Sequence, residues 1–295
     1  MREESVTFMS DGLKLTGVLH IPDDLKPGER RPAMMVLHGF GSNQEAGGCV
    51  IPARMLCDWG YVTFRFSFRG CGKSEGEFGR IICLEQVADT SNAVTFLQSR
   101  PEVDPQRIAT MGSSFGAAVS VYTGGVDKRI AAVISQGGWG DGVRKFKGQH
   151  RTPEAWARFT AMLEEGKRHR ERTGQSLMVD RYDIVPIPEH LRGNLSKGSV
   201  EKFPAETAQS MMEFVADSVV GNIAPRPLLL LHAANDSVTP TEQSIEMFKR
   251  AGQPTDMHLL AEVDHFMFGE KNTRVHSILR DWLDKFFPVK AAVPA

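Results

Sequence analysis

The pentapeptide Gly112-Ser113-Ser114-Phe115-Gly116 places a serine hydroxyl between two symmetric glycines. This G-x-S-x-G spacing suits a sharp strand-to-helix turn, in which crowding of the backbone leaves room only for glycine on either side. Such a turn lifts the central hydroxyl above the sheet and places it at a helix N-terminus, where free N–H groups favour developing negative charge. We therefore predict that Ser114 is a nucleophile. The rival serine, Ser113, lacks the symmetric glycine flanks.

A serine hydroxyl becomes an effective nucleophile only when a base accepts its proton. Of the nine histidines, His265 alone stands in a loop directly after a late strand-like run and follows both Ser114 and Asp236 along the chain. His232 and His258 lie at the end of such runs or within them, and we interpret them as packing residues. The order Ser, Asp, His is that of one class of serine triads. We predict that His265 is the base.

Asp236 stands in the loop after the apolar run 227–232, where a carboxylate can orient His265 and stabilise its imidazolium form. Helix capping is the plain alternative, but nearby threonines can cap the next helix without Asp236. Asp264 is adjacent to His265, yet neighbouring side chains on an extended chain diverge. We therefore predict that Asp236 is the triad acid.

The segment His38-Gly39-Phe40-Gly41 directly follows another apolar run. Glycines in this position let the backbone approach a substrate oxygen. An N–H from this loop, with Phe40 as the favoured donor, and the N–H of Phe115 would form an oxyanion hole. An ordinary strand-to-helix turn is the alternative, and the serine motif downstream favours the catalytic interpretation.

A serine, an acid, a base and an oxyanion loop together predict hydrolysis of a carboxylic ester through an acyl-enzyme. The same groups would serve an amide or peptide, thioester or carbon–carbon bond hydrolase, and the sequence does not separate these reactions. A non-catalytic, hydrolase-like binding protein is the alternative from a different class. It is disfavoured because binding alone does not need all four components.

The elements that must position these residues follow from hydrophobic periodicity. Strands are expected at residues 6–9, 14–21, 33–38, 61–68, 107–111, 130–135, 227–232 and 257–263. Helices are expected at residues 84–98, 115–122, 241–251 and 272–287, and residues 53–59 are expected to be the end of a further helix. This alternation predicts a mainly parallel, doubly wound α/β sheet with helices on both faces, and the leading hairpin predicts an antiparallel N-terminal edge. A loose tail is expected at residues 289–295.

The alternation breaks between residues 139 and 205. We predict a core formed by residues 1–138 and 206–295, and a helical cap insert at 139–205 over the carboxyl ends of the strands. We interpret an aromatic stripe in the insert as packing of the cap on the core. The alternative is that Trp139, Trp156 and Phe159 line a substrate pocket. The insert also contains two basic runs, which we interpret as solvated faces. The alternative is a preference for anionic substrates. The first run is Arg144, Lys145, Lys147 and Arg151, and the second is Lys167, Arg168, Arg170 and Arg172.

Two stretches carry a resemblance to a known family. Residues 103–116, which lead into the serine motif, and residues 68–76 are similar to the α/β-hydrolase superfamily, especially its dienelactone-hydrolase-like and prolyl-oligopeptidase-like esterase branches. The resemblance implies the α/β-hydrolase fold, with a serine, histidine and aspartate acting together. It also implies that Arg69 has a structural role.

The resemblance covers residues 6–135 and 226–287 but not 139–205. Within the covered part, Ser113 stands where many relatives have histidine, which alters the pocket wall and leaves the mechanism intact. Ser67 stands where relatives often have aspartate. For the insert, in contrast, the resemblance implies neither a structure nor a function.

The length, charge and composition of the chain indicate which classes of binding partner to expect. The chain has 295 residues and a formal net charge of -1, so we expect it to bind neither nucleic acid nor a membrane. A hydrolase of this kind is expected to act on a small-molecule substrate. The chain has no apolar leader and no run long enough to span a membrane, which predicts a cytoplasmic protein. The sequence predicts no cofactor and no metal site, and it leaves a homodimer open. Buried free thiols in a reducing compartment are expected for Cys49, Cys57, Cys71 and Cys83.

Overall fold

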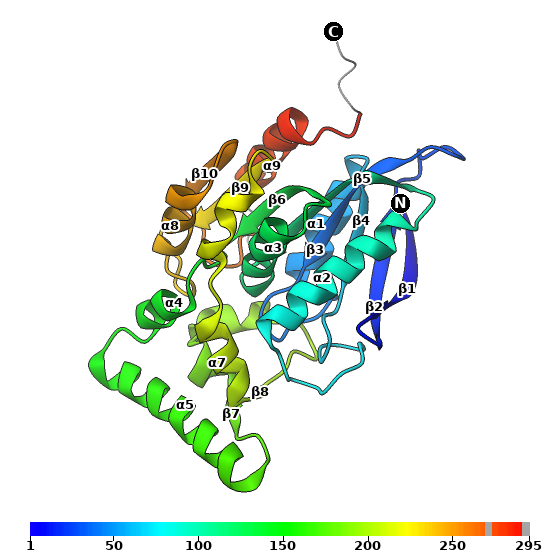
Figure 1. Cartoon of the computed structure of the whole chain (residues 1–295). Coiled ribbons are helices and arrows are strands. Elements are labelled where there is room, and N and C mark those ends of the chain that lie inside the picture. The colour runs from blue at the N-terminus through cyan, green and yellow to red at the C-terminus, as the bar shows by residue number, and fades with distance from the viewer. Residues whose placement is uncertain (269–272, 291–295) are drawn as a thin grey trace.

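An eight-stranded sheet forms the centre of the computed structural model, which describes residues 1–268 and 273–290 (Figure 1). The strand order is β1-β2-β4-β3-β5-β6-β9-β10; the β1–β2 and β2–β4 pairs are antiparallel and the others parallel. This confirms the predicted parallel sheet with an antiparallel N-terminal edge. The strands are β1 (Arg2–Ser10), β2 (Leu13–Ile21), β3 (Arg31–Leu37), β4 (Val62–Phe66), β5 (Val103–Ser113), β6 (Ile130–Gln136), β9 (Leu228–Ala233) and β10 (Thr255–Leu260).

Helices cover both faces of the sheet because alternate side chains of its central strands point to opposite sides. Met35 and Leu37 of β3 belong to one apolar layer, and Met34 and Val36 belong to the other. The first layer includes residues of α2 (Cys83–Gln98), α3 (Phe115–Val126) and α8 (Glu242–Arg250), and the second includes residues of α1 (Gly47–Asp58) and α9 (Thr273–Phe286).

Helix α1 extends from Gly47 to Asp58 and contains Pro52, so its last turns agree with the helix end predicted at residues 53–59. Its start carries no sequence signal, because Ala46 offers no capping side chain and two glycines follow it. The predicted start of the last helix, residue 272, lies outside the described residues, as does most of the predicted tail 289–295.

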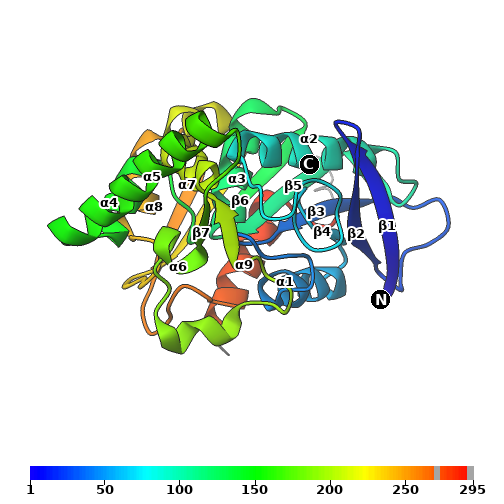
Figure 2. The ribbon, with the colours of Figure 1, turned by 90° about the horizontal axis from the view of Figure 1, so that it is seen from below.

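A long insert separates β6 from β9 and begins where the parallel strand β6 ends (Figures 1 and 2). Seen from below in Figure 2, α4 and α5 lie on the side opposite the β1–β2 hairpin. A two-stranded antiparallel ribbon of β7 and β8, which the sequence did not predict, lies within the insert. The predicted insert 139–205 contains α4 (Gly142–Gln149), α5 (Pro153–Thr173), β7 (Met178–Asp180), α6 (Arg181–Ile184), the 3-10 helix η1 (Glu189–Asn194) and β8 (Lys202–Pro204). Helix α7 (Ala205–Glu213) and the 3-10 helices η2 (Ala216–Ser218) and η3 (Val220–Ile223) follow it before β9.

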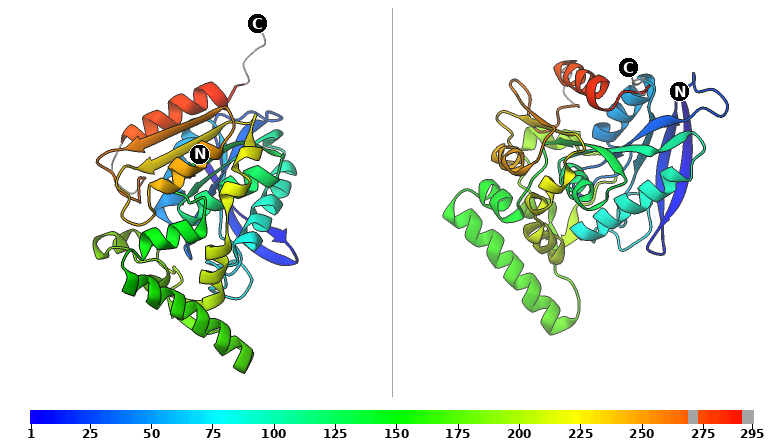
Figure 3. Two further views of the ribbon diagram at one scale, coloured as in Figure 1. Left: turned by 60° about the vertical axis from the view of Figure 1, so that its left-hand side comes forward. Right: turned by 45° about the horizontal axis from the view of Figure 1, so that its top comes forward.

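Helix α5 is the longest element of the insert and projects from the body of the molecule (Figure 3). Its ends carry clear local signals. The Thr152 hydroxyl accepts a hydrogen bond from the Ala155 N–H, Pro153 occupies the first turn, and Gly174 ends the helix in a left-handed conformation. Phe159 and Leu163 are buried along one side of the helix, and α5 contacts α7. Helix α5 is therefore held by Phe146 of α4, against which Phe159 packs, and by α7, which follows the insert.

Two further expectations concern the whole chain. In residues 1–268 and 273–290, no helix combines the length and the apolar character needed to cross a membrane. The four cysteines are buried and free, as the sequence predicted.

Candidate active site

The turn between β5 and α3 has the geometry that the serine motif predicts. Ser114 has φ 56° and ψ -113°, a left-handed conformation that a residue with a side chain adopts only under constraint. A Cβ at Gly116 would lie 2.5 Å from the carbonyl oxygen of Leu37, and a Cβ at Gly112 would collide with the backbone of Gly116. Both flanking glycines are therefore required by close backbone approach, and the serine at the tip stands between them.

His265 and Asp236 form a buried pair. The Nδ1 atom of His265 lies 2.8 Å from Oδ2 and 3.1 Å from Oδ1 of Asp236. Oδ1 also accepts hydrogen bonds from the N–H groups of Val238 at 2.8 Å and Thr239 at 2.7 Å. The carboxylate is thus held by the backbone of its own loop while it orients the histidine ring.

A second histidine stands beside the same carboxylate. Nε2 of His232 lies 3.4 Å from Oδ2 of Asp236 and donates to the Thr239 carbonyl at 3.0 Å. Burial tends to raise the pKa of Asp236, but His265 and His232 together hold that pKa below its usual range. The carboxylate is therefore ionised at neutral pH. The sequence predicts only a packing role for His232, because its place at a strand end gives no sign of this contact.

Asp264 has a different role from Asp236. Its carboxylate accepts hydrogen bonds from the Ser237 N–H at 2.8 Å, the Ser237 hydroxyl at 2.7 Å and the His265 N–H at 2.7 Å. These contacts join the two loops that carry Asp236 and His265. The geometry supports the choice of Asp236 as the acid.

Phe40 and Phe115, the two predicted oxyanion donors, lie on either side of Ser114 in the site: one lines its cavity and the other follows it in the chain. Phe40 lines the cavity that also contains Ser114, and Phe115 is the first residue of α3. Within the described residues, neither of their N–H groups donates a hydrogen bond to another protein group. Both donors therefore remain available to a ligand oxygen.

His38 braces the loop that carries Phe40. Its Nε2 accepts a hydrogen bond from the Phe68 N–H at 3.1 Å, so the ring proton is on Nδ1 and is donated to the Gly39 carbonyl at 2.8 Å. Burial lowers the pKa of His38 to about 4, which keeps the ring neutral at physiological pH. The Gly39 carbonyl and the Phe40 N–H belong to one peptide unit, so this bond helps to orient the N–H.

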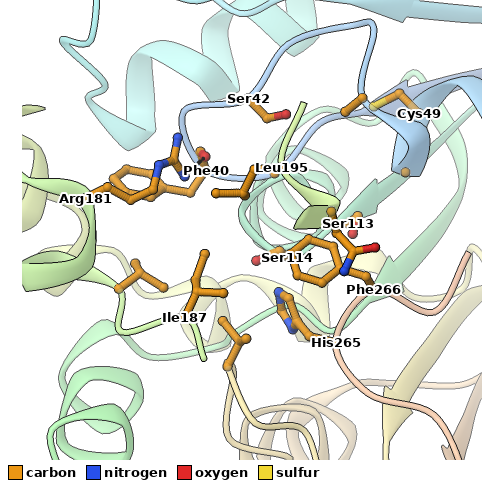
Figure 4. A pocket seen from close by; sticks show the side chains of 16 residues that line it. Phe40, Ser42, Cys49, Ser113, Ser114, Arg181, Ile187, Leu195, His265 and Phe266 are labelled. Carbon is orange, nitrogen blue, oxygen red and sulfur yellow. Dashed lines mark hydrogen bonds between the residues drawn. The ribbon is translucent and has the colours of Figure 1, made fainter. Parts of the chain in front are cut away.

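Phe40, Ser114 and His265 line one small cavity of about 60 Å³. In Figure 4, Ser114 and His265 face it from the β5–α3 turn and from the loop after β10. The lining is mainly apolar. The core contributes Gly39, Phe40, Ser42, Ala46, Gly48, Cys49, Ser113, Ser114, Val238, His265 and Phe266, and the insert contributes Arg181, Val185, Ile187, Asn194 and Leu195.

The three insert residues proposed as a pocket lining lie elsewhere. Trp139 is buried, with its ring 5.6 Å from that of Phe115, and Phe159 packs 4.5 Å from Phe146. Trp156 is half-buried beside Phe159. None of the three is among the described residues that line the cavity, so the pocket-lining alternative is corrected in favour of packing. The cavity wall comes instead from residues 181–195, which have no hydrophobic periodicity to reveal them.

The prediction of a solvated basic run also needs correction. Lys145, within the first run, is only 2% exposed, because α4 turns this residue toward Trp139 and Phe146. Lys147, on the same helix, is exposed as expected.

Known proteins resemble the chain over nearly its whole length. The thiohydrolase aneE of Aspergillus aculeatus is 26% identical over 282 residues, which cover 88% of this chain and 85% of the relative. The polyketide transferase grgF of Penicillium sp is 27% identical over 293 residues, covering 93% of this chain and 92% of the relative. The crystal structure of GrgF matches with a TM-score of 0.78 at 23% identity, covering 99% of this chain and 100% of that one. The hypothetical protein PA2218 from Pseudomonas aeruginosa matches with a TM-score of 0.80 at 22% identity, covering 97% and 94%.

A family model described as "Serine aminopeptidase, S33" matches residues 28–272. The matched span includes the serine turn, the Asp236–His265 pair and the entire insert. The solved structures share the mainly parallel sheet with flanking helices. This chain therefore belongs to the S33 serine aminopeptidase family of α/β-hydrolases.

Proposed function

We propose that this hydrolase cleaves a carboxylic ester through an acyl-enzyme. Ser114 would act as the nucleophile, His265 as the base and Asp236 as the acid. One observation carries the proposal: His265, which Asp236 holds at 2.8 Å, and the strained serine turn border the same cavity. A buried, ionised carboxylate behind a histidine has little purpose in a binding protein.

The proposed reaction proceeds in two steps. Because Nδ1 of His265 faces Asp236, Nε2 is left to accept the Ser114 proton while Oγ attacks the ester carbonyl carbon. The carbonyl oxygen becomes an oxyanion, to which the N–H groups of Phe40 and Phe115 would donate. Collapse breaks the carbon–oxygen bond, and the leaving alkoxide takes the proton from His265. Water then attacks the acyl-enzyme by the same route and releases the acid and Ser114.

The cavity lining supports an uncharged ester over an aminopeptide, despite the peptidase name of the family. An aminopeptidase binds the positively charged N-terminal ammonium group of its substrate. Burying that charge requires a negatively charged partner, such as a carboxylate in the pocket. Among the described residues that line this cavity there is no aspartate or glutamate. The free volume of about 60 Å³ and the apolar walls favour a short acyl group.

Thioester hydrolysis is the second candidate, because the relative aneE is named a thiohydrolase. A thioester would form the same acyl-enzyme and differs only in its leaving group. Amide and carbon–carbon substrates would also use the triad; the family description points to amides, but the described cavity lining lacks the carboxylate that an aminopeptide requires.

A fluorophosphonate probe and a matched substrate panel test the proposal. The probe should label the wild-type protein and Ser113→Ala but not Ser114→Ala. Turnover of acetyl and butyryl esters and thioesters should fall on the order of a millionfold in Ser114→Ala. Ester turnover above thioester and amide turnover supports the ester assignment, and the reverse order favours the second candidate. Unchanged activity in Ser114→Ala would refute the nucleophile.

A further inference from the structure

We propose that Arg181, a residue of the insert, is a positioning residue for the oxyanion hole; this inference rests on the proposed function. Its guanidinium donates to three backbone carbonyls, with Nη1 2.9 Å from the Phe40 oxygen, Nη2 3.0 Å from the Gly41 oxygen and Nε 2.8 Å from the Val200 oxygen. The side chain is buried and lines the same cavity as Ser114. Arg181 therefore holds the loop that carries one of the two proposed oxyanion donors.

The Phe40 N–H is fixed from both sides. In the peptide unit that contains it, the Gly39 carbonyl accepts from His38 at 2.8 Å and from the Ser42 N–H at 3.1 Å. In the following peptide unit, the Phe40 carbonyl accepts from Arg181. These bonds leave the backbone on either side of Phe40 little freedom to rotate, so the direction of its N–H is fixed before the substrate binds.

The loop that contains Phe40 and Gly41 also packs closely against the Arg181 guanidinium. The Arg181 guanidinium lies 5.4 Å from the ring centre of Phe40 and 5.3 Å from that of Phe203, and these two rings stack at 4.2 Å. Gly41 has φ +53°, and a Cβ there would lie 2.9 Å from Nη2 of Arg181 and collide with the Phe203 ring. A glycine at this position lets the loop close on the arginine.

Only arginine offers this arrangement of donors. Its planar fork presents parallel N–H groups that reach two successive carbonyls, whereas a lysine ammonium is a point charge that would reach one well. Within the described residues, no carboxylate lies within ion-pair distance of the guanidinium. The backbone carbonyls are therefore the main groups that stabilise the buried positive charge of Arg181. The position of the guanidinium and the conformation of the loop consequently depend on each other.

Other bonds join the insert to the same loop. The Val200 N–H donates to the Gly41 carbonyl at 2.7 Å, and the hydroxyl groups of Ser42 and Ser196 lie 2.9 Å apart. The Asn43 side-chain amide donates to the Lys197 carbonyl at 3.1 Å. The segment 181–200 thus covers the cavity and also supports the catalytic backbone beneath it.

This role has a kinetic signature. An oxyanion hole stabilises the transition state and not the bound ester, so a displaced donor lowers kcat and leaves KM nearly unchanged. Arg181→Lys should lower kcat roughly 10- to 100-fold, which is less than the loss of a complete donor, and Arg181→Met should lower it further. An arylboronic acid, whose tetrahedral adduct with Ser114 places an oxygen in the hole, should lose affinity in the same proportion.

The matched control is Arg226→Lys. Arg226 also binds backbone carbonyls, those of Gly124, Asp127 and Ile130, but it does so at the opposite end of β6 from the cavity. This substitution should lower thermal stability while kcat and boronate affinity stay at the wild-type level. A purely structural arginine at position 181 would behave like this control.

The experiment measures kcat, KM and the boronate Ki for each variant, with kcat normalised to sites titrated to completion with fluorophosphonate. Parallel losses in kcat and boronate affinity at unchanged KM support the inference. Wild-type kcat per titrated site in Arg181→Lys, or a change confined to KM, overturns it. Failure of the probe to label Ser114 in the wild-type protein would instead refute the proposed function. Because Arg181→Lys keeps the charge, it remains informative if Arg181→Met does not fold.

Discussion

At the scale of single residues, the Asp236 carboxylate is held by more than its contact with His265. Oδ1 accepts the N–H groups of Val238 and Thr239, while Oδ2 faces His265 and His232. A carboxylate fixed in this way determines which ring nitrogen of His265 carries the proton. The backbone bonds also limit what another residue could do at this position.

Asp236→Asn should abolish most activity without loss of the fold. The amide oxygen has to accept the N–H groups of Val238 and Thr239, so the amide nitrogen would face His265 and donate to Nδ1. That donation forces the ring proton onto Nε2, where it blocks acceptance of the Ser114 proton. By comparison with other serine triads, kcat should fall on the order of 10⁴-fold. Steady-state kinetics on a short-chain ester, with circular dichroism as a check on folding, measures this.

Asp264→Asn provides the control for this prediction. Its carboxylate accepts hydrogen bonds from Ser237 and from the His265 backbone and joins two loops. The variant should lose some stability and keep kcat within a few-fold of the wild type. If Asp264→Asn instead shows the large loss while Asp236→Asn remains active, the acid is Asp264.

At the scale of elements, the core was predictable and the insert largely was not. The apolar runs of β3 and β9 are buried along their whole lengths, and the site residues at strand ends are marked by local motifs. The ribbon strands β7 and β8 have three residues each, too few for any periodicity to show. The partners of Arg181 are backbone carbonyls, one of them 141 residues away, and such contacts leave no trace in side-chain patterns.

The correction to the insert changes which residue should control acyl-chain preference. Ile187 is buried and lines the cavity, whereas Trp156 packs beside Phe159 on α5. Ile187→Ala enlarges the cavity and should shift relative kcat/KM from acetyl toward butyryl and hexanoyl esters, by roughly 1–3 kcal/mol per misfitted group. Ratios of kcat/KM across the series measure the shift.

Trp156→Ala serves as the matched comparison within the insert. It should lower the melting temperature and leave the chain-length ratios unchanged, because its ring is not part of the cavity wall. Selectivity that responds to Trp156→Ala but not to Ile187→Ala would mean that the substrate meets α5 and not the segment around Ile187.

At the scale of the whole molecule, sheet order explains why residues so distant in sequence meet. The strands β3, β5, β6, β9 and β10 are successive neighbours in the sheet and all parallel. Their carboxyl ends therefore form one edge, and the loops after β3, β5, β9 and β10 carry Phe40, Ser114, Asp236 and His265. The insert leaves from the end of β6, in the middle of this edge.

Lys145 of α4, in the insert, is buried, and its burial makes the folding stability depend on pH. The Nζ atom of Lys145 in α4 lies 3.9 Å from the Phe146 ring centre and 4.9 Å from that of Trp139, and it donates to Gln149 at 2.8 Å. Burial lowers the pKa of Lys145 to about 7. The facing thiol, Cys83, has its pKa raised by burial to about 12, so in the folded protein it stays uncharged.

Lys145→Met should therefore stabilise the fold most at and below neutral pH. Between pH 7 and about 10.4 the unfolded chain binds the Lys145 proton while the folded chain has released it, so the wild-type unfolding free energy gains up to about 1.4 kcal/mol per pH unit from this group. Below pH 7 both states are protonated and the penalty is constant. The difference between variant and wild type should shrink as pH rises, measured by urea unfolding from pH 6.5 to 9.5. The exposed Lys147→Met, on the same helix, should show a difference that does not vary with pH, and a flat difference for Lys145→Met as well would mean that this lysine keeps its proton in the folded state.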